Sequence, residues 1–109
     1  MLRITELRLP LNHAESALRQ SVLTRLGVQD AALRSVTVFK RAYDARKKSA
    51  IVLIYTVDCD VADEAVVLQR FAADPHVKPS PDTRYKFIGH APADFYACGE
   101  QQRPLVIGF

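Results

Sequence analysis

The order of patterns along the chain predicts an α+β domain of the ferredoxin-like type, a split β-α-β-β-α-β arrangement. Two observations predict this class. Short apolar runs of strand character alternate with segments of helical periodicity, and Gly- or Pro-containing breaks separate them. Such a fold has a four-stranded antiparallel sheet with two helices on one face. Right-handed crossovers then make the first and third strands central neighbours.

Residues 2–11 form the first predicted strand. Its apolar residues change parity once, between Ile4 and Leu7, although the segment is otherwise alternating. A β-bulge or a bend at this point would let both halves face the same core.

A helix is predicted from Ala14 to Leu26. Asn12 followed by Glu15 resembles a capping box, and apolar residues then recur every four positions. Gly27 is a typical residue to end such a helix, because glycine adopts the left-handed backbone conformation readily.

The middle of the chain contributes two strands, a β-branched run at 36–41 and the longer run Ala50–Val61. In Ala50–Val61 one parity is apolar throughout, whereas the other is apolar only in its first half. This pattern predicts a central strand whose second face becomes exposed toward its end.

Asp63 opens a second predicted helix, which ends at the Ala-Ala-Asp-Pro sequence 72–75. Residues 75–83 carry three prolines and are predicted to be a loop. Arg84–Ile88 then alternates and carries charge, which is typical of an edge strand and predicts the fourth strand here.

The composition fits one globular domain: 109 residues, of which 49% are hydrophobic and 25% charged. The longest apolar run, Ala50–Tyr55, is far shorter than a membrane span requires. Charges interrupt the first eight residues, so we expect no secretory signal and a cytoplasmic protein without membrane contact. The net charge of +3 does not by itself demand a nucleic-acid partner.

The cysteines and histidines have no spacing typical of a metal site. Cys59 and Cys98 lie far apart and are expected to be reduced. His13, His76 and His90 fit polar loops better than a metal centre. Because no nucleophile–base motif, paired carboxylates or Gly-rich phosphate loop can be recognised, we predict no metal and no catalytic residue.

The end of the chain does not fit the four-stranded pattern. Residues 89–103 resemble a linker, and residues 104–109 form a new apolar run. This run could be a fifth strand or a tail tucked into the core. A second interpretation is the first strand of a dinucleotide-binding domain, with Gly108 as the first cofactor-binding glycine of a G-x-G-x-x-G fingerprint that the chain does not complete.

Four segments, Phe39–Lys48, Ile51–Asp58, His90–Asp94 and Arg103–Gly108, together resemble the N-terminal region of a bacterial family of uncharacterised FAD-dependent dehydrogenases. The most specific element is Tyr43–Lys48, with the sequence Y-D-A-R-K-K before a long strand. In that family a small N-terminal domain precedes a G-x-G-P-x-G flavin-binding strand and helix and a larger oxidoreductase body. The resemblance implies FAD as the cofactor of the full-length protein.

The sequence departs from that family in two places. The linker from Phe95 to Gln102 is longer than the family pattern, which leaves the position of the flavin domain open. Phe109 ends the chain before the second glycine, so no flavin site is expected to be complete here.

A basic segment precedes the long strand and supplies the candidate anion-binding or docking site. Its residues are Arg41, Tyr43, Asp44, Arg46, Lys47 and Lys48, with Lys40 adding a further cation. Three interpretations stay open: a solvated hairpin in which Asp44 pairs with Arg46 or Arg41, a docking loop or phosphate clamp, and a nucleic-acid contact.

RNA binding of the kind seen in ferredoxin-like recognition modules is disfavoured. Such modules stack bases on aromatic residues of the first and third strands. The aligned stretch here, Lys48–Tyr55, has Ala50 and Val52 at both stacking positions, and residues 2–11 contain no aromatic residue.

We therefore predict a non-catalytic N-terminal domain of an FAD-dependent oxidoreductase, which docks on or regulates the flavin domain of the same polypeptide. Residues 1–88 would be the ferredoxin-like domain, 89–103 a linker and 104–109 the start of the truncated FAD-binding domain. The alternative is a stand-alone ACT-like module that binds a ligand or forms a homodimer through its open sheet face or an edge strand.

Overall fold

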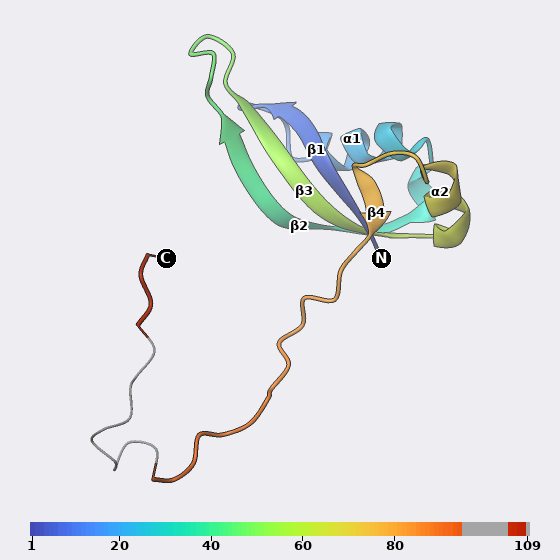
Figure 1. The fold of residues 1–109 in the computed structure, drawn as a ribbon. Helices are drawn as coiled ribbons and strands as arrows, with labels where there is room; N and C mark the ends of the chain where they lie inside the picture. The colour runs from blue at the N-terminus through green and yellow to red at the C-terminus, as the bar shows by residue number, and fades with distance from the viewer. Residues whose placement is uncertain (95–104, 109) are drawn as a thin grey trace.

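The computed structural model describes residues 1–94 and 105–108. Their secondary structure follows the predicted order, as Figure 1 shows. The elements are β1 (Leu2–Pro10), α1 (Ala17–Leu26), the 3-10 turn η1 (Asp30–Ala32), β2 (Leu33–Asp44), β3 (Val52–Val61), α2 (Glu64–Arg70) and β4 (Val77–Pro79). The predicted α+β class is confirmed, with one open antiparallel sheet and two helices in a ferredoxin-like arrangement.

The four strands lie in the order β2-β3-β1-β4, so the first and third strands are central and adjacent, as predicted. The predicted irregularity in β1 is a β-bulge, because the register against β3 shifts between Ile4 and Leu7. Glu6 lies inside this bulge with a φ of 59°. A second register shift lies between Val38 and Lys40 of β2.

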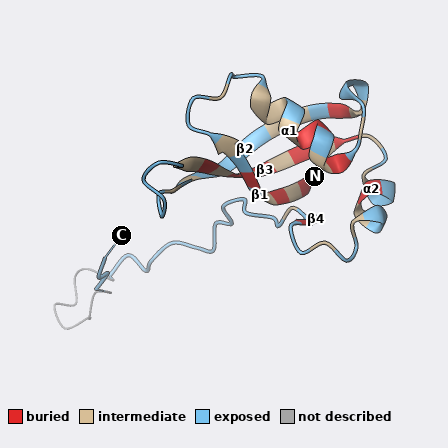
Figure 2. Ribbon diagram, turned by 90° about the horizontal axis from the view of Figure 1, so that it is seen from above, coloured by how far each residue is buried: buried red, intermediate tan, exposed pale blue. Residues whose placement is uncertain are grey.

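One face of the sheet is buried beneath the helices. Alternate residues of β3 are buried from Leu53 to Val61, which places the predicted apolar parity on the core side. Figure 2 shows this buried layer in red on the central strands and α1. The core cluster unites both helices with the sheet and comprises Leu2, Ile4, Leu7, Val22, Leu23, Leu26, Leu33, Leu53, Tyr55, Val57, Cys59, Val61, Val67 and Val77.

The first helix begins at Ala17 rather than Ala14, and the predicted capping box is wrong. Ser16 occupies the cap position without a side-chain hydrogen bond. The preceding residues form turns instead, since the His13 amide donates to the Pro10 carbonyl at 3.2 Å. The predicted stop is confirmed: Gly27 has a φ of 63° and its amide donates to the Leu23 carbonyl.

The fourth strand is Val77–Pro79, which lies inside the segment 75–83 that was predicted to be a loop, and the prediction of a strand at Arg84–Ile88 is wrong. Val77 pairs with Ile4 and is only 3% exposed, so this short segment fills the core beside β1. Pro79 is tolerated because β4 is an edge strand and needs no donor on its outer side. The segment Val77–Pro79 has only three residues and lies between Pro75 and Pro81, so its sequence shows too little alternation to be recognised as a strand.

The described tail residues Leu105–Gly108 are not part of a strand, and all four are exposed. They form neither a fifth strand nor a tail tucked into the core. The linker predicted at 89–103 is described only up to residue 94. Across the described ranges, no helix is long and apolar enough to cross a membrane.

Candidate functional site

The candidate site lies at the far end of the hairpin between β2 and β3. β2 continues to Asp44, beyond the predicted end near Arg41, and β3 begins at Val52. The connecting turn is closed by a hydrogen bond from the Ala50 amide to the Lys47 carbonyl, 3.0 Å long. The hairpin projects beyond the rest of the sheet, as Figure 1 shows. A long two-stranded ribbon therefore presents the basic turn away from the core.

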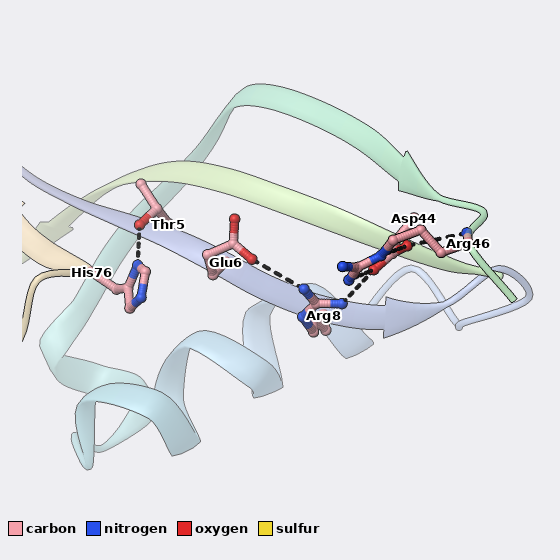
Figure 3. A network of polar contacts seen from close by, with 6 residues as sticks. All are labelled: Thr5, Glu6, Arg8, Asp44, Arg46 and His76. Carbon is pink, nitrogen blue, oxygen red and sulfur yellow. Dashed lines mark hydrogen bonds and ion pairs between the residues drawn. The ribbon is translucent and has the colours of Figure 1, made fainter. Parts of the chain in front are cut away.

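Asp44 is the centre of the polar network in Figure 3. Its carboxylate accepts hydrogen bonds from Arg46 Nε at 2.8 Å, from Arg46 Nη2 at 2.6 Å and from Arg8 Nη1 at 2.9 Å. The Arg46 amide also donates to Asp44 Oδ1 at 3.3 Å. These charge-assisted bonds, those from Arg46 first and then that from Arg8, hold the pKa of Asp44 well below its usual range.

Arg8 connects the hairpin to the first strand. In addition to its bond to Asp44, its Nη2 donates to Glu6 Oε2 at 3.3 Å, as Figure 3 also shows. Glu6 occupies the β-bulge, whereas Arg8 pairs in register with Ile54 of β3. Because Arg8 and Glu6 are about half exposed, these pairs add little stability, and their main effect is to fix the geometry of the turn.

A shallow hollow of about 320 Å³ lies beside this network. Val52 pairs with Asp44 and alternates with the buried Leu53, so the hollow opens on the sheet face away from the helices. The lining of the hollow combines two arginines paired with Asp44 and one lysine. Its lining is Arg8, Asp44, Arg46, Lys47, Ala50 and Val52.

Only some of the site residues that the sequence predicted lie together in the structure. Asp44, Arg46 and Lys47 come together around the hollow. Arg41 and Tyr43 pair with Tyr55 and Leu53, respectively, so they belong to the opposite sheet face. Lys48 is an exposed turn residue.

Several cations of the hairpin have no anionic partner among the residues that the structure describes. Within residues 1–94 and 105–108, no carboxylate lies at ion-pair distance from Lys40, Arg41, Lys47 or Lys48. The hairpin therefore retains exposed positive charge after Asp44 has neutralised part of it.

Sequence reasoning missed Arg8 and Glu6, which complete the network. Arg8 lies 36 positions from Asp44, so local spacing gave no signal for it. Only the register of β1 on β3 brings the two together, and that register depends on the bulge after Ile4. A strand alignment that allowed for the bulge would have found it.

A second polar cluster lies toward the other end of the open face. Arg3 donates to both oxygens of Asp58 at 2.7 and 2.8 Å, and its guanidinium lies 3.7 Å from the ring centroid of Phe39. The bond from Arg3 lowers the pKa of Asp58. Ser80 Oγ also donates to Asp58 at 2.9 Å, so this cluster ties the end of β4 to the sheet.

The histidines lie in separate places. His13 Nε2 is 2.8 Å from the Tyr55 hydroxyl, His76 Nδ1 is 2.8 Å from Thr5 Oγ1, and His90 stacks edge-on against Phe87. In the part of the chain that the structure describes, no three metal-binding side chains gather at one point.

Cys59 is a free cysteine and is fully buried. Burial raises the pKa of its thiol to about 12. A thiol in this state is a core residue rather than a nucleophile. Cys98 lies outside the described residues.

Gly108 is the single residue of the predicted dinucleotide fingerprint that the structure describes. Its φ of 76° lies in the left-handed region, which suits a tight turn after a strand. A Cβ added to Gly108 would meet no atom of the described residues within 4 Å. These residues therefore form no cradle for a dinucleotide around it.

Comparison with known protein families identifies the region that contains this site. Residues 1–60 match a family model described as Domain of unknown function (DUF8436). The chain belongs to this family. The DUF8436 match runs from β1 through most of β3, so it contains Glu6, Arg8, Asp44 and Arg46. No curated protein matches the chain.

Proposed function

We propose that this chain is a non-catalytic N-terminal domain of an FAD-dependent oxidoreductase of the cytoplasm, and that its β2–β3 hairpin docks on the flavin domain of the same polypeptide. The observation that carries the proposal is the hairpin itself. Asp44 fixes Arg46 and Arg8, while Lys47 and Lys48 stay exposed at the tip.

The geometry suits docking because the tip is organised before it meets a partner. Two bonds from the Arg46 side chain to Asp44 restrict a guanidinium that would otherwise lose rotamer freedom on binding. The exposed lysines supply attraction over a longer range, which speeds encounter with an acidic surface or with phosphate groups.

In this proposal the flavin carries the redox chemistry, and the larger body of the protein binds and tunes it. The resemblance of Tyr43–Lys48 and Arg103–Gly108 to the FAD-dependent dehydrogenase family supports this assignment. Leu105 and Ile107 are 83 and 87% exposed, which fits an apolar strand whose packing partners belong to another domain.

The decisive experiment compares two double charge reversals in the longer polypeptide. Lys47→Glu with Lys48→Glu changes the tip, whereas Arg34→Glu with Lys78→Glu makes the same charge change away from it. We expect the tip variant alone to lose carbodiimide cross-links between Lys40, the hairpin amine that both variants keep, and carboxylates of the flavin domain. In the wild-type protein these cross-links should weaken as salt shortens the Debye length from about 10 Å at 0.1 M to about 3 Å at 1 M.

Two results would refute the proposal. One is a reading frame that stops after Phe109, so that no flavin domain follows. The other is a tip variant with unchanged cross-linking, flavin content and turnover.

A second candidate is an ACT-like module that dimerises, and the long edge strand favours it. β2 has 12 residues, and no strand of the described part of the chain pairs with its outer edge. Such an edge can pair with a second copy. Sedimentation of the 109-residue chain distinguishes the two candidates, since a stable dimer together with a stop codon after Phe109 supports the ACT-like alternative.

A further inference from the structure

Residues 84–88 present large apolar side chains to solvent immediately after the folded body. Tyr85 is 88% exposed, Phe87 61% and Ile88 99%. Single exposed apolar residues are normal on a protein surface, but a contiguous group is typical of an interaction site. This group lies within four consecutive positions.

Residues 84–88 pair with neither edge strand of this sheet, β2 or β4. β4 already occupies the outer edge of β1, and the Ser80 amide closes that pairing on the Met1 carbonyl at 3.0 Å. Pro79 is the last residue of β4 and Pro81 follows it, and neither can donate an amide hydrogen bond to extend the ladder.

The segment nevertheless has the sequence of a strand. In an extended backbone Tyr85 and Phe87 share one side, while Arg84 and Lys86 share the other. Its start is fixed locally, because the Arg84 amide donates to Asp82 Oδ1 at 3.0 Å. Strand-like residues that find no pairing in their own domain are suited to pair with the sheet edge of another.

We propose that residues 84–88 bind the flavin domain of the same polypeptide as an added strand, a second contact separate from the hairpin. This inference rests on the proposed function for the existence of that domain. The position of the segment selects this partner, because it lies between the folded body and the exposed apolar residues Leu105–Ile107. A tethered partner has a high effective concentration compared with any free protein.

The charges indicate which surface receives the segment. Arg84 and Lys86 are basic, like the hairpin tip, so an acidic border around an apolar groove or sheet edge would suit both contacts. Two weak contacts on one partner hold it more firmly than either contact alone.

Trypsin tests the two contacts separately in a single digest, because it cleaves after lysine and arginine. Cleavage after Arg84 and Lys86 reports on the segment, and cleavage after Lys47 and Lys48 reports on the hairpin. We expect cleavage after Arg84 and Lys86 to be at least roughly tenfold slower in the longer polypeptide than in the 109-residue chain, since proteolysis requires an open backbone.

Equal cleavage rates after Arg84 and Lys86 in the two proteins would overturn the added-strand contact. Protection after Lys47 and Lys48 in the same digest would then leave the hairpin proposal intact. A reading frame that ends at Phe109 would overturn both proposals.

A variant pair provides the matched control. Tyr85→Ser with Phe87→Ser should restore rapid cleavage after Arg84 and Lys86 in the longer polypeptide. Val66→Ser, which changes a side chain 65% exposed on α2, should leave the protection unchanged. If the Tyr85/Phe87 variant kept the wild-type protection, the apolar side chains would not be the contact and the inference would fail.

Discussion

Replacing Val77 with alanine tests which segment is the fourth strand of the sheet. Val77 is 3% exposed and pairs with Ile4, whereas Phe87 in the alternative segment is 61% exposed. Val77→Ala removes two buried methyl groups, worth about 1.6 kcal/mol at about 0.8 kcal/mol each, and the residual cavity raises the cost to about 2 kcal/mol. For a body of this size, the melting temperature should fall by about 8–16 °C.

Phe87→Ala in the same 109-residue chain should change the free energy of unfolding by less than about 0.5 kcal/mol, because its ring is not part of the core. Both variants are measured by urea unfolding followed by circular dichroism. Val66→Ala serves as an exposed control on α2. The reasoning is refuted if Phe87→Ala costs about 3–5 kcal/mol, as truncation of a core phenylalanine does, while Val77→Ala has no effect.

Three further predictions concern the hairpin, the core thiol and the first helix. Asp44 has a depressed pKa in the folded state, so its contribution to stability is present above its ordinary pKa of about 3.9 and is lost as the pH falls below that value. Urea unfolding of Asp44→Asn should therefore differ from wild type most at pH 7 and least in acid; a difference that grows toward acid would contradict this. Burial of Cys59, with a pKa of about 12, should slow its reaction with a disulfide reagent at pH 8 on the order of a thousandfold relative to the urea-unfolded chain. This rate is measured with Cys98→Ser as background, and equal folded and unfolded rates would argue against the burial. Gly27→Ala should cost about 1 kcal/mol in thermal unfolding because of its φ of 63°, whereas Gly89→Ala should be neutral; equal effects would speak against backbone strain.

The candidate site was only partly predictable. The residues from Arg41 to Lys48 predicted a basic turn before a long strand, and this pattern was enough to identify the hairpin. Which of its residues work together depends on strand alternation at the end of β2, because Asp44 and Tyr43 fall on opposite faces. Arg8 enters through a cross-strand position that local spacing does not reveal.

The sequence by itself determined the class of the fold, the order of its elements and the position of the bulge in β1. These features follow from local periodicity, since alternation and helical spacing show which residues must share a buried face. Gly27 likewise marked the end of α1 through its own backbone preference.

Only the tertiary structure decided where the fourth strand lies and where the first helix begins. A three-residue edge strand is selected by the space that Val77 fills beside Ile4, not by its own propensity. His13 contacts Tyr55 of β3, a residue 42 positions away, immediately before residues 14–16, which the capping pattern had assigned to the helix and which precede α1 in the structure. Both outcomes depend on long-range packing and hydrogen bonds, and the energy of such contacts exceeds the weak local preferences that a sequence pattern records.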